Sequence, residues 1–409
     1  MKLHLTGPAE QQLHANIKIT GSKSESNRSL LLAALYKGIV IKNLSNSDDA
    51  QVMQQGLQKD SGIVDIHHAG TAMRFLTGYF ASQEGKEVVL TGSKRMTERP
   101  IKILVDALRD LGATISYANE EGYPPIKISG KSLIKDKVSL PANVSSQYIS
   151  SLLLIAPSLK NGLELELVGK ITSVPYIKMT LSLLDEFEIP NSFHGNLIKV
   201  AAKPSVVPTT LVVESDWSSA SYYYSIVAMA AVGSQITLSA YKSNSLQGDS
   251  VLAKIYTHFG VTTTFAENSV TLKKSEDPKN ANVEFDLANA PDIAQTIAVT
   301  VFGLGMGCYL TGLHTLKIKE TDRLEALHTE LSKLGSDISV TNKSLTIKPT
   351  NTIIRDVVID TYNDHRMAMA FAPLALKKSI YINEAGVVSK SYPDFWEDLK
   401  ALQFSIKEL

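Results

Sequence analysis

The sequence repeats one pattern six times, and this repeat limits the possible folds more than any other feature of the chain. Each copy opens with small or polar residues that lead into a short apolar stretch of helical periodicity. A short run with the apolar pattern of a β-strand follows each stretch. The predicted helices are SESNRSLLLAAL, GTAMRFLTGYF, SSQYISSLLLIA, SSASYYYSIVAMAA, PDIAQTIAVTVFGL and NDHRMAMAFAPLAL, and the strands after them are GIVIKNL, EVVLTG, LELELVG, QITLSA, CYLTGL and SIYINEA.

A second helix and paired strand runs complete each predicted copy. Helix-capping residues place the starts of the second helices near Asp48, Thr97, Val174, Gln247, Glu320 and Ser391. The starts of the first helices at Ser145, Ser218, Asp292 and Asp364 recur at about 73 residues, a steadier spacing than chance alternation of helices and strands would give. Each copy is therefore predicted to hold two helices and about four strands, with the first copy shortened. A chain of 409 residues fits two domains, which gives three copies to each.

The composition indicates a globular protein without a strong overall charge. The 41 basic and 41 acidic side chains cancel, which argues against nucleic acid or an anionic membrane as a partner. The N-terminus has no apolar signal core, and no run approaches the roughly 20 apolar residues that span a bilayer, so we expect a cytoplasmic protein. The single cysteine, Cys308, lies in an apolar stretch, which predicts a buried thiol and excludes an internal disulfide.

Charged and polar residues gather at the predicted helix starts. The free N–H groups and the positive dipole end of a helix favour anions, so several converging starts would form a site for phosphate or carboxylate. The segment GSKSESNRS places Lys23, Ser24 and Arg28 at such a start, without the glycine spacing of a nucleotide-binding loop. An anion site and a capped, solvated helix start both explain this segment.

Further charged clusters lie at other predicted helix starts. Helix caps or surface salt bridges would explain each cluster separately, whereas an anion site would explain them together. Adjacent His67 and His68 suggest a metal, but neighbours in sequence rarely share one ligand sphere without further cysteine or carboxylate ligands, so we expect no metal there. The clusters are Gly70 with Arg74, Arg95 with Arg99, Lys319 with Glu320 and Arg323, Asp364 with His365 and Arg366, and Lys390 in SKSYPDF.

The ordered motifs of the whole chain resemble those of one enzyme family. The motifs are GSKSESNR, GTAMR, RMTERP, VSSQ, SVPY, SLQGD, PD, KETDR, NDHRMAM and SKSYPDF, and they stand in the order found in the 5-enolpyruvylshikimate-3-phosphate synthase family. The resemblance implies an α/β fold of the inverse-barrel (α+β) type, with two domains of three units each, helices inside and mixed four-stranded sheets outside. Residues 1–19 with 214–409 would form one domain and residues 20–213 the other. The active site would lie in the cleft between the two domains, with hinges near Thr20 and Val213.

The resemblance also implies an activity and its substrates. The enzyme would transfer the enolpyruvyl group of phosphoenolpyruvate to the 5-hydroxyl of shikimate 3-phosphate, as a monomer without cofactor or metal. A ring of cations would offset the repulsion between the two anionic substrates. Shikimate 3-phosphate would bind Lys23, Ser24, Arg28, Ser145, Ser146, Gln147, Ser173, Tyr176, Asp292, Thr315 and Lys319. Phosphoenolpyruvate would bind Lys23, Gly70, Arg95, Gln147, Arg323, Arg366 and Lys390.

Three residues would carry the proton transfers of this reaction. By the same resemblance, Asp292 takes the proton of the substrate hydroxyl, while Glu320 and Lys23 handle the protons at the methylene carbon and the bridging oxygen.

The sequence departs from the family pattern at three positions near the implied substrates. His68 and Phe75 replace the usual Asn and Pro around GTAMR, so we expect phosphoenolpyruvate and the inhibitor glyphosate to bind near Gly70 with a shifted relative affinity. Thr315 stands where the family commonly has Asn, and its shorter side chain would reach shikimate 3-phosphate through water.

Two alternative functions fit parts of the sequence. The first is an enolpyruvyl transferase acting on a UDP-linked amino sugar, which usually carries a reactive cysteine on a mobile loop, whereas Cys308 lies in an apolar run. The second is a catalytically silent anion-binding scaffold on the same repeat, against which Lys23, Asp292 and Glu320 argue.

Overall fold

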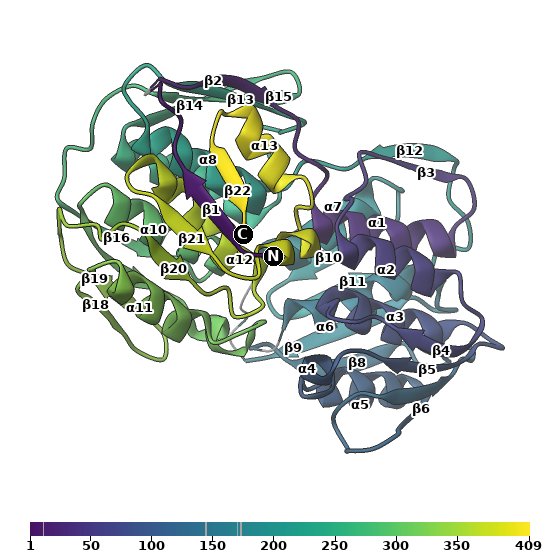
Figure 1. Ribbon diagram of the computed structural model, residues 1–409. Helices are drawn as coiled ribbons and strands as arrows, with labels where there is room; N and C mark the ends of the chain where they lie inside the picture. The colour runs from purple at the N-terminus through teal and green to yellow at the C-terminus, as the bar shows by residue number, and fades with distance from the viewer. Residues whose placement is uncertain (11, 144, 170, 172–173) are drawn as a thin grey trace. The chain divides into compact units, whose positions relative to one another are not determined.

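The computed structural model describes residues 1–10, 12–143, 145–169, 171 and 174–409, and the chain folds into two compact units (Figure 1). Unit 1 consists of Met1–Thr20 and Glu214–Leu409, and unit 2 consists of Gly21–Val213. Each unit encloses its own hydrophobic core. Each unit therefore has the packed interior that an independent domain requires.

One sheet topology recurs in both units. Five sheets have four strands, and each of these contains one parallel pair followed by two antiparallel pairs, as in the order β4-β5-β7-β6. The sixth sheet holds only the parallel pair β3 and β12. The predicted repeat with a shortened first copy is thereby confirmed, because the first copy keeps the parallel pair and lacks the two antiparallel strands.

Unit 2 contains three of the sheets: β12-β3, β4-β5-β7-β6 and β10-β11-β9-β8. Its helices, with η denoting a 3-10 helix, are α1 (Lys23–Leu35), α2 (Asp48–Leu57), α3 (Gly70–Ser82), α4 (Lys94–Thr97), α5 (Lys102–Leu111), α6 (Ser146–Ile155), η1 (Ala156–Ser158) and α7 (Val174–Asp185). Its strands are β3 (Ile39–Lys42), β4 (Ser61–Asp65), β5 (Glu87–Thr91), β6 (Thr114–Tyr117), β7 (Ile126–Ser129), β8 (Lys137–Pro141), β9 (Leu163–Val168), β10 (Asn191–His194), β11 (Leu197–Val200) and β12 (Thr209–Val212).

Unit 1 contains the sheets β14-β15-β13-β2, β16-β17-β19-β18 and β20-β21-β1-β22, so the N-terminal strands complete two of its sheets. Its helices are α8 (Trp217–Met229), η2 (Gly248–Val251), α9 (Leu252–Ile255), η3 (Tyr256–Phe259), η4 (Pro291–Ile293), α10 (Ala294–Gly303), η5 (His314–Ile318), α11 (Arg323–Lys333), α12 (His365–Phe371), η6 (Ala372–Leu376), η7 (Ala385–Lys390) and α13 (Phe395–Ala401). Its strands are β1 (Leu3–Thr6), β2 (His14–Ile17), β13 (Gln235–Ser239), β14 (Val261–Ala266), β15 (Ser269–Lys274), β16 (Asn282–Asp286), β17 (Gly307–Thr311), β18 (Ile338–Val340), β19 (Leu345–Ile347), β20 (Val357–Ile359), β21 (Ile380–Ile382) and β22 (Ser405–Glu408).

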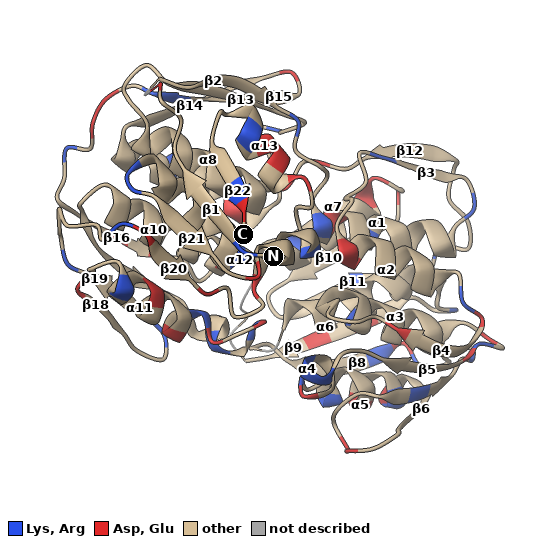
Figure 2. Cartoon of the chain, viewed as in Figure 1, with Lys and Arg blue, Asp and Glu red and all other residues tan. Residues whose placement is uncertain are grey.

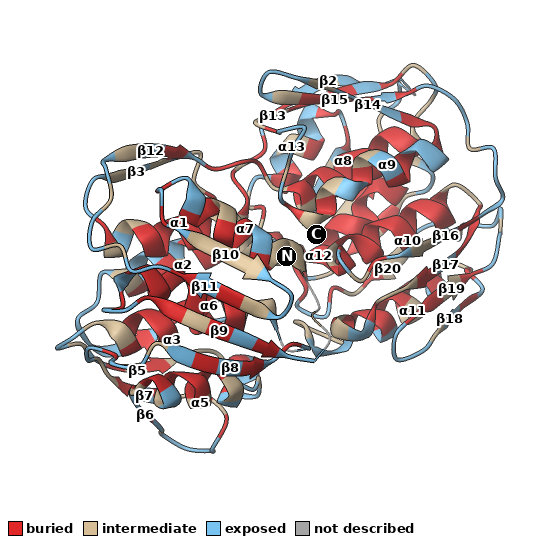
Figure 3. Ribbon diagram, turned by 180° about the vertical axis from the view of Figure 1, so that it is seen from behind, coloured by how far each residue is buried: buried red, intermediate tan, exposed pale blue. Residues whose placement is uncertain are grey.

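The first helix of each copy lies in the interior of its unit, and the sheets lie outside (Figure 3). Every residue of α10 is buried, as are nearly all residues of α3 and α8. The strands alternate instead, as in β8, whose residues are exposed and buried in turn. An interior helix must be apolar all round, which explains why the sequence shows continuous apolar stretches there.

Three predicted starts of second helices are wrong by several residues. The start near Thr97 is the end of the short helix α4, and α5 begins at Lys102. The start near Glu320 lies ahead of α11, because Asp322 is the residue whose carboxylate accepts the N–H groups of Leu324 and Glu325. The start near Ser391 follows η7, and α13 begins at Phe395.

Candidate active site

Three interior helices of unit 2 begin with residues that the sequence marked as anion ligands. Lys23 is the first residue of α1, Gly70 is the first residue of α3, and the Ser145 hydroxyl caps α6. These three helices pack against one another. The Gln147 side chain at the start of α6 donates a hydrogen bond to the Thr71 hydroxyl of α3 at 3.1 Å, which joins two of the starts. Unit 2 thus presents adjacent helix N-termini, whose free N–H groups favour an anion.

Arg28 of α1 is buried among neutral groups. Its guanidinium donates to the hydroxyls of Thr180 and Ser150 at 2.8 and 2.9 Å and to the Ser24 carbonyl at 2.7 Å. The Phe75 ring lies against it, with a distance of 5.3 Å from the guanidinium carbon to the ring centroid. No carboxylate in the described part of the chain forms an ion pair with it. Because no ion pair offsets the loss of hydration, burial lowers the pKa of Arg28 to about 10.

Arg74 of α3 has the same character, although no substrate role was predicted for it. Its guanidinium is buried and donates to the carbonyls of Gly70 and Pro100, both at 3.2 Å, and to the sulfur of Met96 at 3.5 Å. Burial, and then the charge of Arg99, lower the pKa of Arg74 to about 10. The Arg99 side chain packs over Gly70, where an added Cβ would lie 2.8 Å from a guanidinium nitrogen. The glycine at this helix start therefore leaves room for a cation.

The other predicted ligands of unit 2 lie at its helix starts or on its surface. Lys23 forms an ion pair with Asp49 at 3.7 Å, a partner that the sequence analysis missed. Arg95 is about half exposed and pairs with Glu98 at 3.4 Å, a surface salt bridge of the kind that the sequence analysis considered for these clusters. Ser24 and Ser146 lie in the first turns of α1 and α6, and Tyr176 lies in the first turn of α7, with its ring against Arg28. Ser173 lies outside the described residues.

In unit 1, Arg323 links three carboxylates from three segments of the chain. Its guanidinium lies 2.7 Å from Asp364, 2.9 Å from Asp292 and 2.8 Å from Glu320. Arg323 and Asp364 are fully or almost fully buried, whereas the side chains of Asp292 and Glu320 keep 16% and 24% of their surface exposed. Although burial alone would lower the pKa of Arg323, the charges of Asp364, Glu320 and Asp292 raise it. The arrangement fixes two partly exposed carboxylates on one buried cation.

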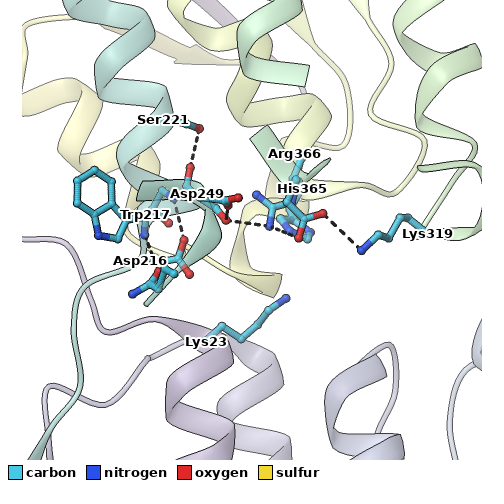
Figure 4. A network of polar contacts seen from close by, with 12 residues as sticks. Lys23, Asp216, Trp217, Ser221, Asp249, Lys319, His365 and Arg366 are labelled. Atoms are coloured by element: carbon cyan, nitrogen blue, oxygen red, sulfur yellow. Dashed lines mark hydrogen bonds and ion pairs between the residues drawn. The ribbon is translucent and has the colours of Figure 1, made fainter. Parts of the chain in front are cut away.

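Asp292 pairs with two further cations beside Arg323, namely Lys319 and Arg366, which are labelled in Figure 4. One of its oxygens lies 3.5 Å from the Lys319 ammonium, and the other lies 3.2 Å from the Arg366 guanidinium. Arg366 is buried, and its Nε has no hydrogen-bond partner among the residues described. The structure thus brings together five predicted residues of unit 1: Asp292, Lys319, Glu320, Arg323 and Arg366.

Two predicted ligands of unit 1 lie apart from this ion-pair group. The Lys390 ammonium donates to the backbone and side-chain oxygens of Asn363 at 2.6 and 2.8 Å. Thr315 lies in η5, and its buried hydroxyl has no hydrogen-bond partner in the described chain. A hydroxyl buried in this way is a ready donor for a ligand or a water molecule.

The buried arginines of the two units therefore differ in the groups that contact them and in the direction of their pKa shifts. In unit 2, Arg28 and Arg74 are held by neutral oxygens and have lowered pKa values. In unit 1, Arg323 and Arg366 are held by carboxylates and have raised pKa values, despite burial. Figure 2 shows the remaining charge of both signs spread over each unit. Among the described residues, neither Arg28 nor Arg74 of unit 2 forms an ion pair with a carboxylate, whereas the buried arginines of unit 1 hold oriented carboxylates.

Three further features of the described residues concern metal binding, membrane-spanning helices and the thiol of Cys308. No group of three His, Cys, Asp or Glu side chains among them is arranged to hold a metal ion. None of their helices is long and apolar enough to cross a membrane. Cys308 is 3% exposed, and burial raises the pKa of its thiol to about 12. The predicted buried thiol is confirmed, and such a thiol is a poor nucleophile.

The fold is that of known enolpyruvyl transferases. The chain superposes on a crystal structure of EPSP synthase from Acinetobacter baumannii with a TM-score of 0.84 and 22% identity, and each chain is covered completely. It also superposes on the enolpyruvyl transferase NikO from Streptomyces tendae with a TM-score of 0.77 and 14% identity, over 99% of this chain and 98% of the other.

The sequence narrows this class to one family. The model of the family EPSP synthase (3-phosphoshikimate 1-carboxyvinyltransferase) matches residues 8–59 and 58–399. The 3-phosphoshikimate 1-carboxyvinyltransferase of Bacteroides fragilis is 46% identical over 100% of this chain and 99% of the relative. The protein of the same name from Histophilus somni is 35% identical over 96% of this chain and 97% of its own length. The chain belongs to the EPSP synthase family, as its motifs predicted.

Proposed function

We propose that this enzyme transfers the enolpyruvyl group of phosphoenolpyruvate to the 5-hydroxyl of shikimate 3-phosphate and releases phosphate, in the pathway to chorismate and the aromatic amino acids. Family membership and the full-length similarity to named 3-phosphoshikimate 1-carboxyvinyltransferases support this activity. We further propose that it works in the cytoplasm as a monomer, with its active site between the two units.

The observation that carries the proposal is the pair of carboxylates, Asp292 and Glu320, held on the one buried guanidinium of Arg323. Addition followed by elimination needs one group that accepts a proton and one that donates it, and the two must exchange roles in the second step. Two carboxylates on one rigid cation, both partly exposed, meet this need because neither can turn away from the reacting atoms without breaking an ion pair.

The proposed steps balance as follows. The 5-hydroxyl of shikimate 3-phosphate gives its proton to Asp292 and attacks carbon 2 of phosphoenolpyruvate, while carbon 3 receives a proton from Glu320 or Lys23. The tetrahedral intermediate then loses phosphate, which takes up the proton held on Asp292, as carbon 3 returns its proton to the group that donated it. The division of the transfers between Glu320 and Lys23 rests on the family resemblance.

The uncompensated cations of unit 2 suit the two anionic substrates. On this proposal, the ligands of shikimate 3-phosphate are Lys23, Ser24, Arg28, Ser145, Ser146, Gln147, Ser173 and Tyr176 in unit 2, and Asp292, Thr315 and Lys319 in unit 1. The ligands of phosphoenolpyruvate are Lys23, Gly70, Arg95 and Gln147 in unit 2, and Arg323, Arg366 and Lys390 in unit 1. Planar guanidinium groups favour the bidentate geometry of phosphate and carboxylate.

Release of inorganic phosphate tests the function directly. Purified enzyme with both shikimate 3-phosphate and phosphoenolpyruvate should release phosphate, and omission of either substrate should stop the release. Replacing shikimate 3-phosphate by a UDP-linked amino sugar serves as the matched control. Phosphate release with the amino sugar alone would favour the alternative transferase, and release with neither acceptor would contradict the proposed activity.

A further inference from the structure

Asp249 is a buried carboxylate beside the proposed active site to which no role has been given. It lies in η2, within the motif SLQGD, and is 4% exposed. Its Oδ2 accepts a hydrogen bond from the Ser218 hydroxyl in the first turn of α8. Its Oδ1 is buried and has no hydrogen-bond partner among the described residues. A buried carboxylate oxygen without a donor is costly in its ionised form, so its place here needs an explanation.

The Ser218 hydroxyl connects Asp249 to the ion-pair group of unit 1. It accepts a hydrogen bond at 3.2 Å from the same Arg366 nitrogen that lies 3.2 Å from Asp292 Oδ2. Figure 4 shows Asp249 beside Arg366 in this network. The chain of contacts runs from Asp249 through Ser218 and Arg366 to Asp292. A change of charge at Asp249 therefore acts on the guanidinium that is proposed to hold phosphoenolpyruvate.

Charge balance shows what ionisation of Asp249 does to this group. The linked side chains are three cations, Lys319, Arg323 and Arg366, and four carboxylates, Asp249, Asp292, Glu320 and Asp364. With Asp249 ionised, the carboxylates outnumber the cations by one. With Asp249 protonated, the charges of the linked group cancel. Protonation of Asp249 removes one negative charge, so an anionic substrate is repelled less in the second state than in the first.

We propose that Asp249 is a positioning residue for the enolpyruvyl transfer, which acts through Ser218 and Arg366 and admits phosphoenolpyruvate in its protonated form. The proposal rests on the proposed function, because it assigns Asp249 an effect on that reaction's substrate.

The surroundings of Asp249 place its titration near neutral pH. The charged groups that face it are Asp292 from η4, Arg366 from α12 and Asp216, the N-cap of α8. Burial, and then the charge of Asp292, raise the pKa of Asp249 to about 7, against the opposing effects of Arg366 and the Ser218 hydrogen bond. A rise in pH through 7 therefore converts Asp249 from the protonated form, which favours binding of phosphoenolpyruvate, to the ionised form, which disfavours it.

The pH dependence of KM for phosphoenolpyruvate measures this effect. Because the pKa is about 7, the protonated fraction falls from about nine tenths at pH 6 to about one tenth at pH 8, which raises KM by up to about tenfold. Asp249→Asn keeps the shape of the side chain and removes the titration. We expect the ratio of the wild-type KM to the Asp249→Asn KM to rise by up to about tenfold from pH 6 to pH 8, with a much smaller change in the kcat ratio.

Using this ratio cancels the titration of the substrate phosphates, which is the same for both proteins. Asp337→Asn, which removes an exposed carboxylate of unit 1, is the matched control and should follow the wild type at every pH. A purely structural role would change kcat and KM alike at all pH values. A KM ratio that stays constant between pH 6 and pH 8 would overturn the proposal, whereas absence of wild-type phosphate release would instead overturn the proposed function.

A second variant covers the case in which Asp249→Asn does not fold. The Ser218 hydrogen bond favours the ionised form of Asp249, so Ser218→Ala should move the rise of KM to a higher pH, and it should make the rise smaller because the hydroxyl that joins Asp249 to Arg366 is lost. An unchanged midpoint in Ser218→Ala would contradict the proposed link, and a midpoint that moves upward would support it.

Discussion

Substitution of Arg28 tests whether the buried guanidinium groups of unit 2 serve to bind an anionic substrate. Its pKa of about 10 lies below the ordinary value of about 12.5. At about 1.4 kcal/mol for each pH unit, this difference means that burial of the charge costs roughly 3 kcal/mol of folding free energy. Replacement by Met removes the charge but keeps a long apolar side chain against Phe75 and Tyr176.

The loss of hydrogen bonds offsets part of this gain. Arg28 gives up three donated bonds, but the hydroxyls of Thr180 and Ser150 remain bonded to each other at 3.0 Å, so neither is left unsatisfied. We therefore expect Arg28→Met to leave the free energy of unfolding unchanged or to raise it by up to about 3 kcal/mol. The same substitution should weaken the binding of shikimate 3-phosphate by up to about 100-fold, because it removes a charged hydrogen-bond donor to the substrate that is worth about 1.5–3 kcal/mol.

Urea unfolding followed by circular dichroism measures the first effect, and titration calorimetry with shikimate 3-phosphate measures the second. Arg109→Met, which replaces a partly exposed arginine of unit 2 whose ring contact is with Tyr117, controls for the general effect of losing an arginine. A fall in stability of more than about 1 kcal/mol for Arg28→Met would show that the guanidinium is a structural support and would refute the reasoning.

Three other variants follow from the described contacts. Arg323→Met should destabilise the protein by about 3–5 kcal/mol in the same unfolding experiment, because it leaves the buried carboxylate of Asp364 without its cation; stability equal to the wild type would contradict the ion-pair account. Cys308→Ser should keep full activity, and a thiol reagent should not inactivate the native wild type, since burial raises the pKa of this thiol to about 12. The double variant His68→Asn with Phe75→Pro should change the ratio of the competitive inhibition constant of glyphosate to KM for phosphoenolpyruvate. The reason is that Phe75 packs against Arg28 and His68 forms a hydrogen bond with Ser93 at 2.8 Å. An unchanged ratio would reject this expectation.

The repeat could be predicted from the sequence because its signal is local. The first helix of each copy is buried all round and therefore stands out as an unbroken apolar stretch, as in PDIAQTIAVTVFGL. The second helices were placed less well, because their starts depend on caps and turns that the sequence offers in excess. Asp322 caps α11, although Glu320 two residues earlier was a comparable candidate.

The environment of each charged side chain could not be predicted. The same residue type, arginine, is bonded by hydroxyls and carbonyls at position 28 and by three carboxylates at position 323. These partners come from distant parts of the chain, so no local sequence pattern predicts them. In the sequence, Asp249 is simply the last residue of the motif SLQGD, and nothing there indicates that it is buried. Its burial near Arg366 depends on the packing of η2 against α8.

On the proposed function, Asp292 and phosphoenolpyruvate compete for the guanidinium of Arg366. Arg366 lies 3.2 Å from Asp292, and its buried Nε has no hydrogen-bond partner among the described residues. The proposed substrate would therefore share a guanidinium that already faces a carboxylate. Asp292→Asn removes the competing charge and should tighten the binding of phosphoenolpyruvate several-fold in the presence of shikimate 3-phosphate. The same change removes the proposed base and should lower kcat by about 10²–10⁴-fold. Weaker binding of phosphoenolpyruvate by Asp292→Asn, measured by calorimetry, would show that the carboxylate supports the substrate rather than competes with it.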